Sequence, residues 1–453
     1  MSMKPEALDS RPSAQDFGHD SAMTLGVMGQ HPTGLATLFF TEMWERFSYY
    51  GMRAFLILYM TAPAVSSGLG FDDAKAASIY GLYTGSVWGA AILGGLVADR
   101  LLGQYRSVLA GGAVIALGHF VLAFDIMSAF YAGLVLIVVG TGLLKPNVST
   151  LVGSLYAPGD ARRDAGFSIF YMGINLGAFI GPLIAGYLAQ RVNWHVGFAA
   201  AGVGMTLGLV QYVLGRRPLQ EAERTIARKA QTATAAAASG LTTDDYKRLS
   251  AVVVFFVFVS VFWGAYEQAG STLNLFADRH TRLYFAGFNF PSSWFQSVPA
   301  LFVIILAPVF AWLWTTLGDR QPSTPAKFVY GLVFAGLAFL LLIPAGRFAE
   351  QGSLVSPLWL VGAYLILELG ELCLSPVGLS AVTKLAPTQL VGLAMGIWFL
   401  SNSAGNMLAG WAGTFFSTLP LPTLFGASAA ATMAAAVILL ALLKPIKGLM
   451  AGR

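Results

Sequence analysis

The sequence has little charge and almost no cysteine. Asp, Glu, Lys and Arg make up 11% of its 453 residues, whereas a soluble globular domain carries about 25%. The single cysteine, Cys373, excludes a disulfide within the chain and a cysteine-rich metal site. Five histidines lie scattered without the spacing of metal ligands, and there is no Gly-rich phosphate loop or nucleophile–base spacing. We therefore expect no metal, no cofactor and no enzymatic activity.

The chain is instead rich in apolar residues. Hydrophobic residues account for 56% of it and its mean hydropathy is +0.67, which indicates an integral membrane protein embedded in a lipid bilayer. The net charge of +5 comes from Lys and Arg in polar segments and forms no patch typical of nucleic-acid binding. The beginning of the chain lacks the apolar core and cleavage site of a signal peptide. We expect residues 1–34 to form a solvated cytoplasmic tail.

Apolar segments long enough to cross a bilayer, at about 20 residues per crossing, recur along the sequence. Lys and Arg concentrate in every second polar segment between them, as they do on the cytoplasmic side of membrane proteins. The pattern predicts an all-α membrane protein with twelve transmembrane helices and both termini in the cytoplasm. The predicted spans are 36–62, 76–98, 106–125, 129–150, 165–189, 196–214, 250–277, 293–317, 326–344, 355–382, 388–417 and 423–443.

The longest polar interruption, residues 216–248, divides these spans into six and six. We interpret residues 35–215 and 249–443 as two six-helix bundles, and residues 444–453 as a cytoplasmic C-terminal tail. Two interpretations of the segment between the bundles remain open. It is either a flexible cytoplasmic linker or an amphipathic helix that lies on the membrane surface.

The first predicted span contains charges that cannot face lipid. An isolated ion in the bilayer core costs several kcal/mol, on the order of 3 or more. Spacings of three and four residues place the polar groups of this span on one helix face. That face must therefore line a polar cavity enclosed by protein. It consists of Glu42, Glu45, Arg46, Tyr49, Tyr50 and Arg53.

Four further ionisable residues interrupt apolar spans: Lys145 in the fourth, Glu267 in the seventh, and Glu368 and Glu371 in the tenth. The first bundle thus supplies both signs of charge and the second supplies carboxylates only. This asymmetry favours ion pairs between the bundles, which protonation of a carboxylate would weaken. Such pairs can act as gates, and separate cationic and anionic poles would suit a zwitterionic substrate. The alternative is that the pairs only fix helix packing.

The polar loop after the second span resembles a short motif of the major facilitator superfamily. It contains Asp99, Arg100, Gly103 and Arg106. An Asp at a helix end can pair with Arg side chains or with the N-terminus of another helix, so this loop would latch two helices on the cytoplasmic side. An ordinary basic loop is the alternative. With two halves of six spans each, the loop suggests the major facilitator fold.

Six motifs, in order along the chain, resemble those of the proton-dependent oligopeptide transporters, a branch of that superfamily. The first is the Glu-x-x-Glu-Arg-Phe-x-Tyr-Tyr run that begins at Glu42, and the third is Phe-Tyr-x-x-Ile-Asn-x-Gly, which contains Asn175. The resemblance implies a bacterial di- and tripeptide transporter, a multi-pass protein of the inner (cytoplasmic) membrane. The motifs occupy residues 42–50, 142–147, 170–177, 266–271, 370–380 and 398–401.

By this resemblance, matched residues acquire roles in coupling and gating. Arg53 with Glu267 would form the extracellular gate pair, and Lys145 with Glu371 the cytoplasmic one. A transported proton would be handled mainly on the first span. The residues implied in proton coupling are Glu42, Glu45, Arg46 and Glu267.

The resemblance also implies how a peptide is bound. Arg53 and Lys145 would bind its carboxylate, and Glu371 and Asn175 its amino terminus. For Asn175 the alternative is a hydrogen bond between helices, and for the aromatic residues it is packing in the core or at the lipid interface. The aromatic residues expected to line the cavity are Tyr49, Tyr50, Tyr171 and Trp398.

The sequence departs from the family pattern at several places. Members usually carry Asn-Pro where this chain has Pro299 and Ala300, and often Tyr where it has Trp88. Glu368 is a carboxylate not expected in the pattern. It is a second proton site, a contact to the peptide amine, or a packed residue without a role in transport. Residues 216–248 are too polar to contain the two extra helices that many bacterial members have.

The function we expect is proton-coupled symport of di- and tripeptides, by alternating access of the two bundles, in a protein that works as a monomer. Three alternatives remain. A transporter of another anion, such as nitrate, would not need the carboxylates of the first span. A proton/drug antiporter would lack matched poles for a zwitterion, and a membrane enzyme would need the motifs that this chain lacks.

Overall fold

The computed structural model describes residues 31–157, 160–233, 243–285, 287–386 and 391–450. Within these ranges the apolar runs form long α-helices, as the sequence predicts. A short antiparallel hairpin, in which β1 (Tyr284–Phe285) pairs with β2 (Phe288–Asn289), interrupts the helical pattern. The predicted tail 1–34 lies mostly outside the described residues, and α1 begins at Gly34.

Seven helices cover the first predicted bundle. They are α1 (Gly34–Thr61), α2 (Asp73–Val97), α3 (Gln104–Leu122), α4 (Met127–Ser154), α5 (Arg163–Gly181), α6 (Tyr187–Arg191) and α7 (Trp194–Leu214). A π-helical turn at Ala98–Leu102 extends α2, and another at Pro182–Gly186 joins α5 to α6. The second turn begins at a proline, whose nitrogen cannot donate the usual helical hydrogen bond. Because this turn joins them without a gap, helices α5 and α6 form one continuous span.

Eight further helices follow residue 242 in the described part of the chain. They are α9 (Thr243–Tyr266), α10 (Thr272–His280), α11 (Val298–Leu317), α12 (Thr324–Glu350), α13 (Leu358–Leu385), α14 (Val391–Gly413), α15 (Leu421–Ala441) and, at the end, the short α16 (Leu443–Met450). A 3₁₀ turn at Glu267–Gly270 separates α9 from α10. Residues 444–450 of the predicted tail are thus helical, and α9 begins several residues before the predicted end of the linker.

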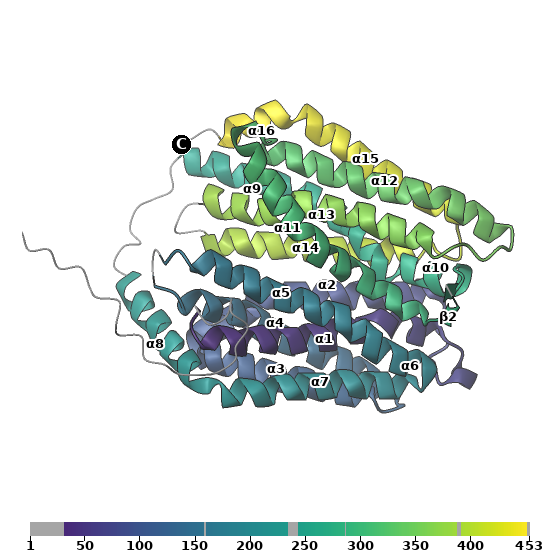
Figure 1. The fold of residues 1–453 in the computed structure, drawn as a ribbon, viewed down its shortest axis with the longest axis horizontal. Helices are drawn as coiled ribbons and strands as arrows, with labels where there is room; N and C mark the ends of the chain where they lie inside the picture. Colours follow the sequence, from purple (N-terminus) through teal and green to yellow (C-terminus); the bar gives the residue numbers. More distant parts are fainter. Residues whose placement is uncertain (1–30, 158–159, 234–242, 286, 387–390, 451–453) are drawn as a thin grey trace, which may run out of the picture.

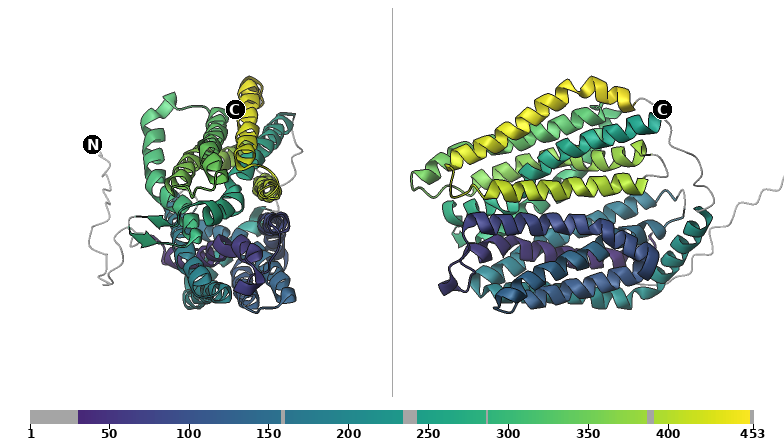
Figure 2. Two further views of the ribbon diagram at one scale, coloured as in Figure 1. Left: turned by 90° about the vertical axis from the view of Figure 1, so that its right-hand side faces the viewer. Right: turned by 180° about the vertical axis from the view of Figure 1, so that it is seen from behind.

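The two sets of helices lie side by side. In Figure 1, α1 to α7 (purple to teal) occupy one half of the molecule and α9 to α15 (teal to yellow) the other, and the view from behind in Figure 2 agrees. The β1–β2 hairpin lies at one end of the helices, which we call the hairpin end. Helix α8 (Arg216–Ala233) lies at the opposite end, which we call the α8 end.

Most of these helices can cross a membrane. Ten helical segments among the described residues are long and apolar enough to do so. Helix α1 is not one of them, although it has 28 residues, because it carries the four charged residues described above. Helix α14 is the other predicted span outside this set. It contains polar Ser and Asn residues, which lower its hydropathy.

The two halves approach closely where α2 crosses α14. A Cβ atom built on Gly410 would lie 2.5 Å from the Cα atom of Gly81, and one on Gly85 would lie 2.8 Å from the Met407 side chain. Glycine at these positions allows the helix backbones to touch, as small residues do in membrane helix pairs. This contact holds α2 of the first half against α14 of the second.

The segment between the halves contains a helix rather than only a flexible linker. Of the two interpretations, the flexible one is wrong for residues 216–233, which form α8. Its apolar residues Leu219 and Ala222 are buried, and Leu219 packs in a core cluster with Leu35 and Tyr105 of the first half. Part of the apolar face of α8 therefore contacts protein.

Helix α8 also caps another helix. The Glu223 carboxylate accepts a hydrogen bond of 3.0 Å from the backbone N–H of Tyr105, in the first turn of α3. The residue before α3, Gly103, has φ of +76° and no side chain that could cap the helix. A Cβ there would lie 2.4 Å from the Glu223 carboxylate. Glu223 thus satisfies an N-terminal donor of α3 and fixes α8 to the first half.

We predict that Glu223→Ala lowers the midpoint of thermal unfolding of the detergent-solubilised protein. The reason is the loss of a helix cap, which costs about 0.5–2 kcal/mol. Glu223→Gln should lose less, since its amide oxygen can still accept from the Tyr105 N–H. Gln220→Ala, on the exposed face of α8, is the control. Equal midpoints for Glu223→Ala and Gln220→Ala would contradict the capping role.

Candidate functional site

The charged face of α1 is buried and internally paired. Arg46 is 1% exposed, Glu42 2% and Glu45 0%. The Arg46 Nε atom lies 3.3 Å from Glu42 Oε1 and also contacts Glu45 Oε2. Its guanidinium lies 5.2 Å from the centre of the Tyr49 ring. The three- and four-residue spacing predicted from the sequence therefore places these groups together, away from lipid.

This cluster keeps unused hydrogen-bonding capacity. In the described structure, Glu42 Oε2, Glu45 Oε1 and Arg46 Nη2 are buried without a hydrogen-bond partner. Two carboxylates share one guanidinium, so the cluster carries a net negative charge when both are ionised. Binding one proton would make it neutral, and this is the favoured charge in an apolar interior. The cluster is therefore chemically suited to bind and release a proton.

Arg53 joins the two halves. Its guanidinium Nη2 forms an ion pair with Glu267 Oε2, and its Nε donates a hydrogen bond of 2.5 Å to the Tyr80 hydroxyl. Both side chains are largely buried, with 8% of Arg53 and 5% of Glu267 exposed. Because Glu267 opens the 3₁₀ turn between α9 and α10, it lies at a break in the span. A Cβ on Gly270, at the end of this turn, would lie 1.8 Å from the Tyr80 hydroxyl.

Further polar contacts join the halves towards the hairpin end. Asp73, the first residue of α2, accepts two hydrogen bonds of 2.7 and 2.6 Å from the Arg279 guanidinium of α10, and it contacts Ser417 as well. Asn274 donates to the backbone oxygen of Ala54 at 2.8 Å. Further pairs between the halves are Gln190 with Asp278, Ser292 and Ser293, Trp294 with Leu183, Ser297 with Phe179, and Ser403 with Gly85. The hairpin end is thus closed by contacts between the halves.

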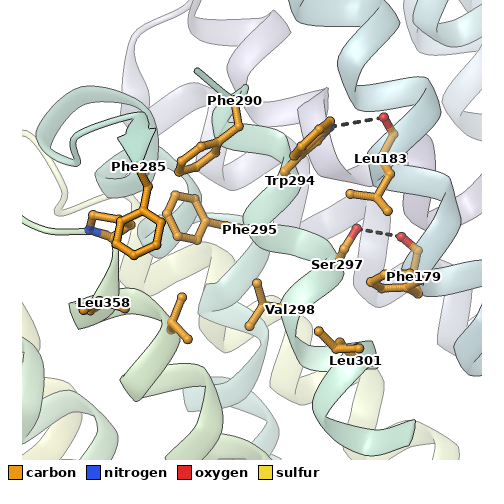
Figure 3. A pocket seen from close by; sticks show the side chains of 12 residues that line it. Phe179, Leu183, Phe285, Phe290, Trp294, Phe295, Ser297, Val298, Leu301 and Leu358 are labelled. Atoms are coloured by element: carbon orange, nitrogen blue, oxygen red, sulfur yellow. Dashed lines mark hydrogen bonds between the residues drawn. The ribbon is translucent and has the colours of Figure 1, made fainter. Parts of the chain in front are cut away.

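An apolar pocket lies beside these contacts. It has a volume of about 280 Å³ and is lined by residues such as Phe179, Leu183, Trp294 and Phe295. Figure 3 shows the Trp294–Leu183 and Ser297–Phe179 hydrogen bonds along its wall. None of the predicted site residues lines it. The pocket therefore belongs to the packing between the halves and not to the charged site.

Lys145 has an aromatic partner instead of the predicted carboxylate. Its Nζ atom lies 3.1 Å from the centre of the Trp88 ring. The Trp88 ring stacks on that of Phe399 of α14, with 6.1 Å between the ring centres. Lys145 and Glu371 form no ion pair in the described structure. Their pairing stays a prediction. The indole face provides a cation–π contact, so the substituted aromatic at position 88 supports the lysine in this state.

Two carboxylates of α13 lie near the middle of the second half. Glu371 is 9% exposed and Glu368 is 0% exposed. The Tyr266 hydroxyl donates a hydrogen bond of 2.6 Å to Glu368 Oε1. Tyr266 comes immediately before Glu267, so one short segment contacts both Glu368 and Arg53.

The remaining predicted residues differ in their exposure. Asn175 is buried and donates to the backbone oxygen of Tyr171 one turn earlier, at 3.0 Å. Tyr171 is 41% exposed, whereas Tyr49 is 1% and Trp398 7% exposed. Trp398 packs closely on Gly378, where a Cβ would lie 2.2 Å from its ring. Of these residues, Tyr171 is therefore the most exposed in this structure.

Sequence reasoning missed three contributors to the site. Tyr80, Tyr266 and the Asp73–Arg279 pair make the contacts described above. Tyr266 belongs to the motif at residues 266–271, but nothing in the local sequence of these residues identifies their partners far along the chain. A buried tyrosine hydroxyl needs a partner. That rule marks Tyr80 and Tyr266, in otherwise apolar helices, as candidates without naming the partner.

Comparisons with known proteins agree along nearly the whole chain. The profile PTR2, described as the POT family, matches residues 105–241 and 217–426. The chain is 43% identical to the uncharacterized transporter YclF of Bacillus subtilis, over 93% of this chain and 96% of YclF. It is 36% identical to a di-/tripeptide transporter of Lactococcus lactis subsp. cremoris, over 92% and 96%. The crystal structure of a peptide transporter POT in complex with sulfate superposes with a TM-score of 0.85, at 43% identity over 93% and 96% of the two chains.

We predict that Glu267→Gln loosens the hairpin end, because it leaves the buried Arg53 charge unpaired at a cost of about 3–5 kcal/mol. The reporter is Ser293→Cys in a Cys373→Ser background. Ser293 is 0% exposed at the junction of the halves, and its hydroxyl has no hydrogen-bond partner in the described structure. Labelling of this cysteine by a water-soluble maleimide should become faster in Glu267→Gln.

The control for this labelling is Glu350→Gln. The Glu350 carboxylate accepts from the Leu421 N–H within the second half, so its loss should leave the rate unchanged. Exchanging the two charges, Arg53→Glu with Glu267→Arg, should restore slow labelling. An unchanged rate in Glu267→Gln would contradict the closing role of the pair.

Proposed function

Because the chain belongs to the POT family of transporters, we propose that it takes up di- and tripeptides together with protons. It is a multi-pass membrane transporter and not an enzyme, since its family and its relatives are transporters. One observation above all supports the finer proposal: the Arg53–Glu267 ion pair crosses between the halves, next to a cluster of two carboxylates and one arginine on the same helix.

The proposed membrane topology has twelve crossings. To the ten apolar segments it adds α1, whose charges face protein, and α14, which packs on α2 through glycine. Residues 35–215 and 249–443 form the two bundles, residues 216–248 connect them, and both termini lie in the cytoplasm. The α8 end then faces the cytoplasm and the hairpin end the outside, in the inner membrane of a bacterial cell. The working unit is the monomer.

The transport cycle is alternating access. Contacts between the halves close the hairpin end, while Lys145 and Glu371, further towards the α8 end, are not paired in the described structure. Such an arrangement suits a state that is closed to the outside and releases substrate to the cytoplasm. The opposite state requires Arg53 and Glu267 to separate and Lys145 to meet Glu371. Rocking of two halves around a central site exchanges these states.

Proton coupling follows because a proton that binds Glu42, Glu45 or Glu267 weakens the hold of that carboxylate on Arg46 or Arg53. Protonating Glu42 or Glu45 leaves Arg46 with one ionised partner instead of two. Protonating Glu267 removes the charge that holds Arg53, which weakens the closed hairpin end and leaves Arg53 able to bind a carboxylate. A proton from outside and a peptide carboxylate thus favour the same rearrangement.

The substrate that fits is a short zwitterion. Arg53 and Lys145 provide the cationic pole for the peptide carboxylate, and Glu371 and Asn175 the polar groups for its amino terminus. Lys145 rests on the Trp88 ring, so that its charge is available to an incoming anion. The aromatic walls are Tyr49, Tyr50, Tyr171 and Trp398. Recognition of both chain ends, with water filling unused volume, leaves the side chains loosely specified.

We predict that the purified protein in liposomes accumulates labelled dialanine when an inward proton gradient is imposed. The gradient supplies the energy, so a protonophore should abolish accumulation and leave only equilibration. Unlabelled di- and tripeptides should compete, and tetrapeptides should compete weakly because the two poles fix the distance between the ends. Uptake of equal extent with and without the gradient would rule out symport.

We further predict that Glu45→Gln separates binding from coupling. It removes one ionisable partner of Arg46 but keeps the side-chain shape, so labelled dialanine should still exchange across the membrane while gradient-driven uptake is lost. Counterflow and driven uptake in the same liposome preparation measure the two activities. Loss of both would assign Glu45 to peptide binding or to folding instead.

A further inference from the structure

Glu368 is an ionisable residue that the proposed cycle does not use. It lies in the middle of α13 and is 0% exposed. Its neighbours in sequence are Leu367 and Leu369. A Cβ atom built on the nearby Gly370 would lie 2.9 Å from the Gly331 backbone oxygen and 3.1 Å from the Phe334 side chain of α12. A carboxyl group at such a position must either be paired with a cation or carry a proton.

The contacts of Glu368 contain no cation. Its Oε1 atom accepts the hydrogen bond from the Tyr266 hydroxyl, whereas Oε2 is buried and without a hydrogen-bond partner among the described residues. None of the ion pairs in that part of the chain involves it. One oxygen is therefore stabilised by a donor, and the other is placed where a proton would reside.

The charged and titratable groups around Glu368 are mostly acidic or neutral. Glu371 follows one turn along α13, and its side chain contacts the Glu368 carboxyl. Tyr266 and Glu267 approach from the α9–α10 junction. The part of α12 nearest to Glu368 is apolar. Lys327 of α12 donates a hydrogen bond of 2.8 Å to the Gln321 side chain. Helices α11 and α14, which also pack on α13, contain no Asp, Glu, Lys, Arg or His. Tyr171 of α5 lies within electrostatic range of both Glu368 and Glu371.

We propose that Glu368 is a further proton-binding site of the transporter, in addition to the α1 cluster and Glu267. This proposal rests on the proposed function, which it deepens. The proton binds at Oε2 while Glu368 is enclosed, and it leaves to water when the movement of the halves opens this region. No other bond forms or breaks in this step.

Tyr266 links this site to the closed hairpin end. Tyr266 holds Glu368, and the next residue, Glu267, holds Arg53 across the halves. When Arg53 and Glu267 separate, the 3₁₀ turn at Glu267–Gly270 is released from the first half. This release moves the Tyr266 hydroxyl, and the number of hydrogen bonds that Glu368 accepts changes as a result. The proton occupancy of Glu368 is therefore coupled to the conformation of the transporter.

A contact between Glu368 and the peptide amine is less consistent with the geometry. The carboxyl is fully enclosed, and its donor is a tyrosine of the same half. Glu371, one turn along and 9% exposed, is better placed for that contact. A purely structural role also leaves the unpartnered Oε2 unexplained, because a glutamine would fill the position and supply its own donors.

The test is the number of protons moved per peptide, measured in proteoliposomes. It is obtained from the membrane potential at which net dialanine flux stops for fixed proton and peptide gradients. The variant is Glu368→Gln, with Glu368→Asp as the conservative substitution and Glu350→Gln as a control carboxylate outside the proposed machinery. We expect Glu368→Gln to move one proton fewer per peptide and to keep counterflow, whereas Glu368→Asp and Glu350→Gln keep the ratio of the unchanged protein.

Two results would overturn the proposal. An unchanged ratio in Glu368→Gln with normal uptake would leave Glu368 as a packed residue, and an unchanged ratio with a raised KM for peptide would make it an amine contact. If the unchanged protein shows no gradient-driven uptake, the proposed function fails, and this proposal fails with it.

A second measurement applies if Glu368→Gln is inactive even in counterflow. The infrared carbonyl band of protonated carboxyl groups is recorded in detergent as a function of pH for the unchanged protein and the variant. A pH-dependent band that is present in the unchanged protein and missing from Glu368→Gln supports proton binding at Glu368. Identical spectra in both proteins overturn it.

Discussion

The requirement that every buried charge has a partner governs this molecule. Arg46 is held by two carboxylates of its own helix, and Arg53 by Glu267 of the opposite half. Both guanidinium groups lie where lipid would otherwise surround them, so the helices must enclose them. This enclosure brings α1 into the centre of the first half and draws the break between α9 and α10 towards it. The closed hairpin end then follows from the same pairing, reinforced by Asp73 and Arg279.

The sequence was sufficient where a pattern is local. Spacings of three and four residues predicted the charged face of α1, and motif order predicted the family, which the comparisons confirm. Helices occupy the positions of the predicted spans, because apolar length is a property of each segment, whereas the count of twelve crossings stays a prediction. Opposite charges in apolar spans predicted ion pairs between the bundles, and the family resemblance implied the contact of Arg53 with Glu267 that the structure contains. The roles of these residues in gating, coupling and binding stay predictions.

Other features depend on conformation or on distant partners and were not predictable. Lys145 contacts the Trp88 ring and forms no ion pair with Glu371 among the described residues, and nothing local to either residue predicts that choice of partner. Tyr266 meets Glu368 only through the packing of α9 on α13. The helix at residues 216–233 was one of two interpretations, because the segment is mostly polar. Only a few apolar residues, such as Leu219, pack against the first half, and they form no clear pattern in the sequence.

The docking of α8 has a consequence for how the protein can be divided. Leu219 and Glu223 attach α8 to helices that precede it in the chain. The boundary between the structural halves therefore falls after α8, at the C-terminal side of the polar segment, and not at its start. Two polypeptides that meet between α8 and α9 would each contain a complete set of packed helices. Such a pair of fragments could be co-expressed and labelled separately, so that each half carries its own spectroscopic probe.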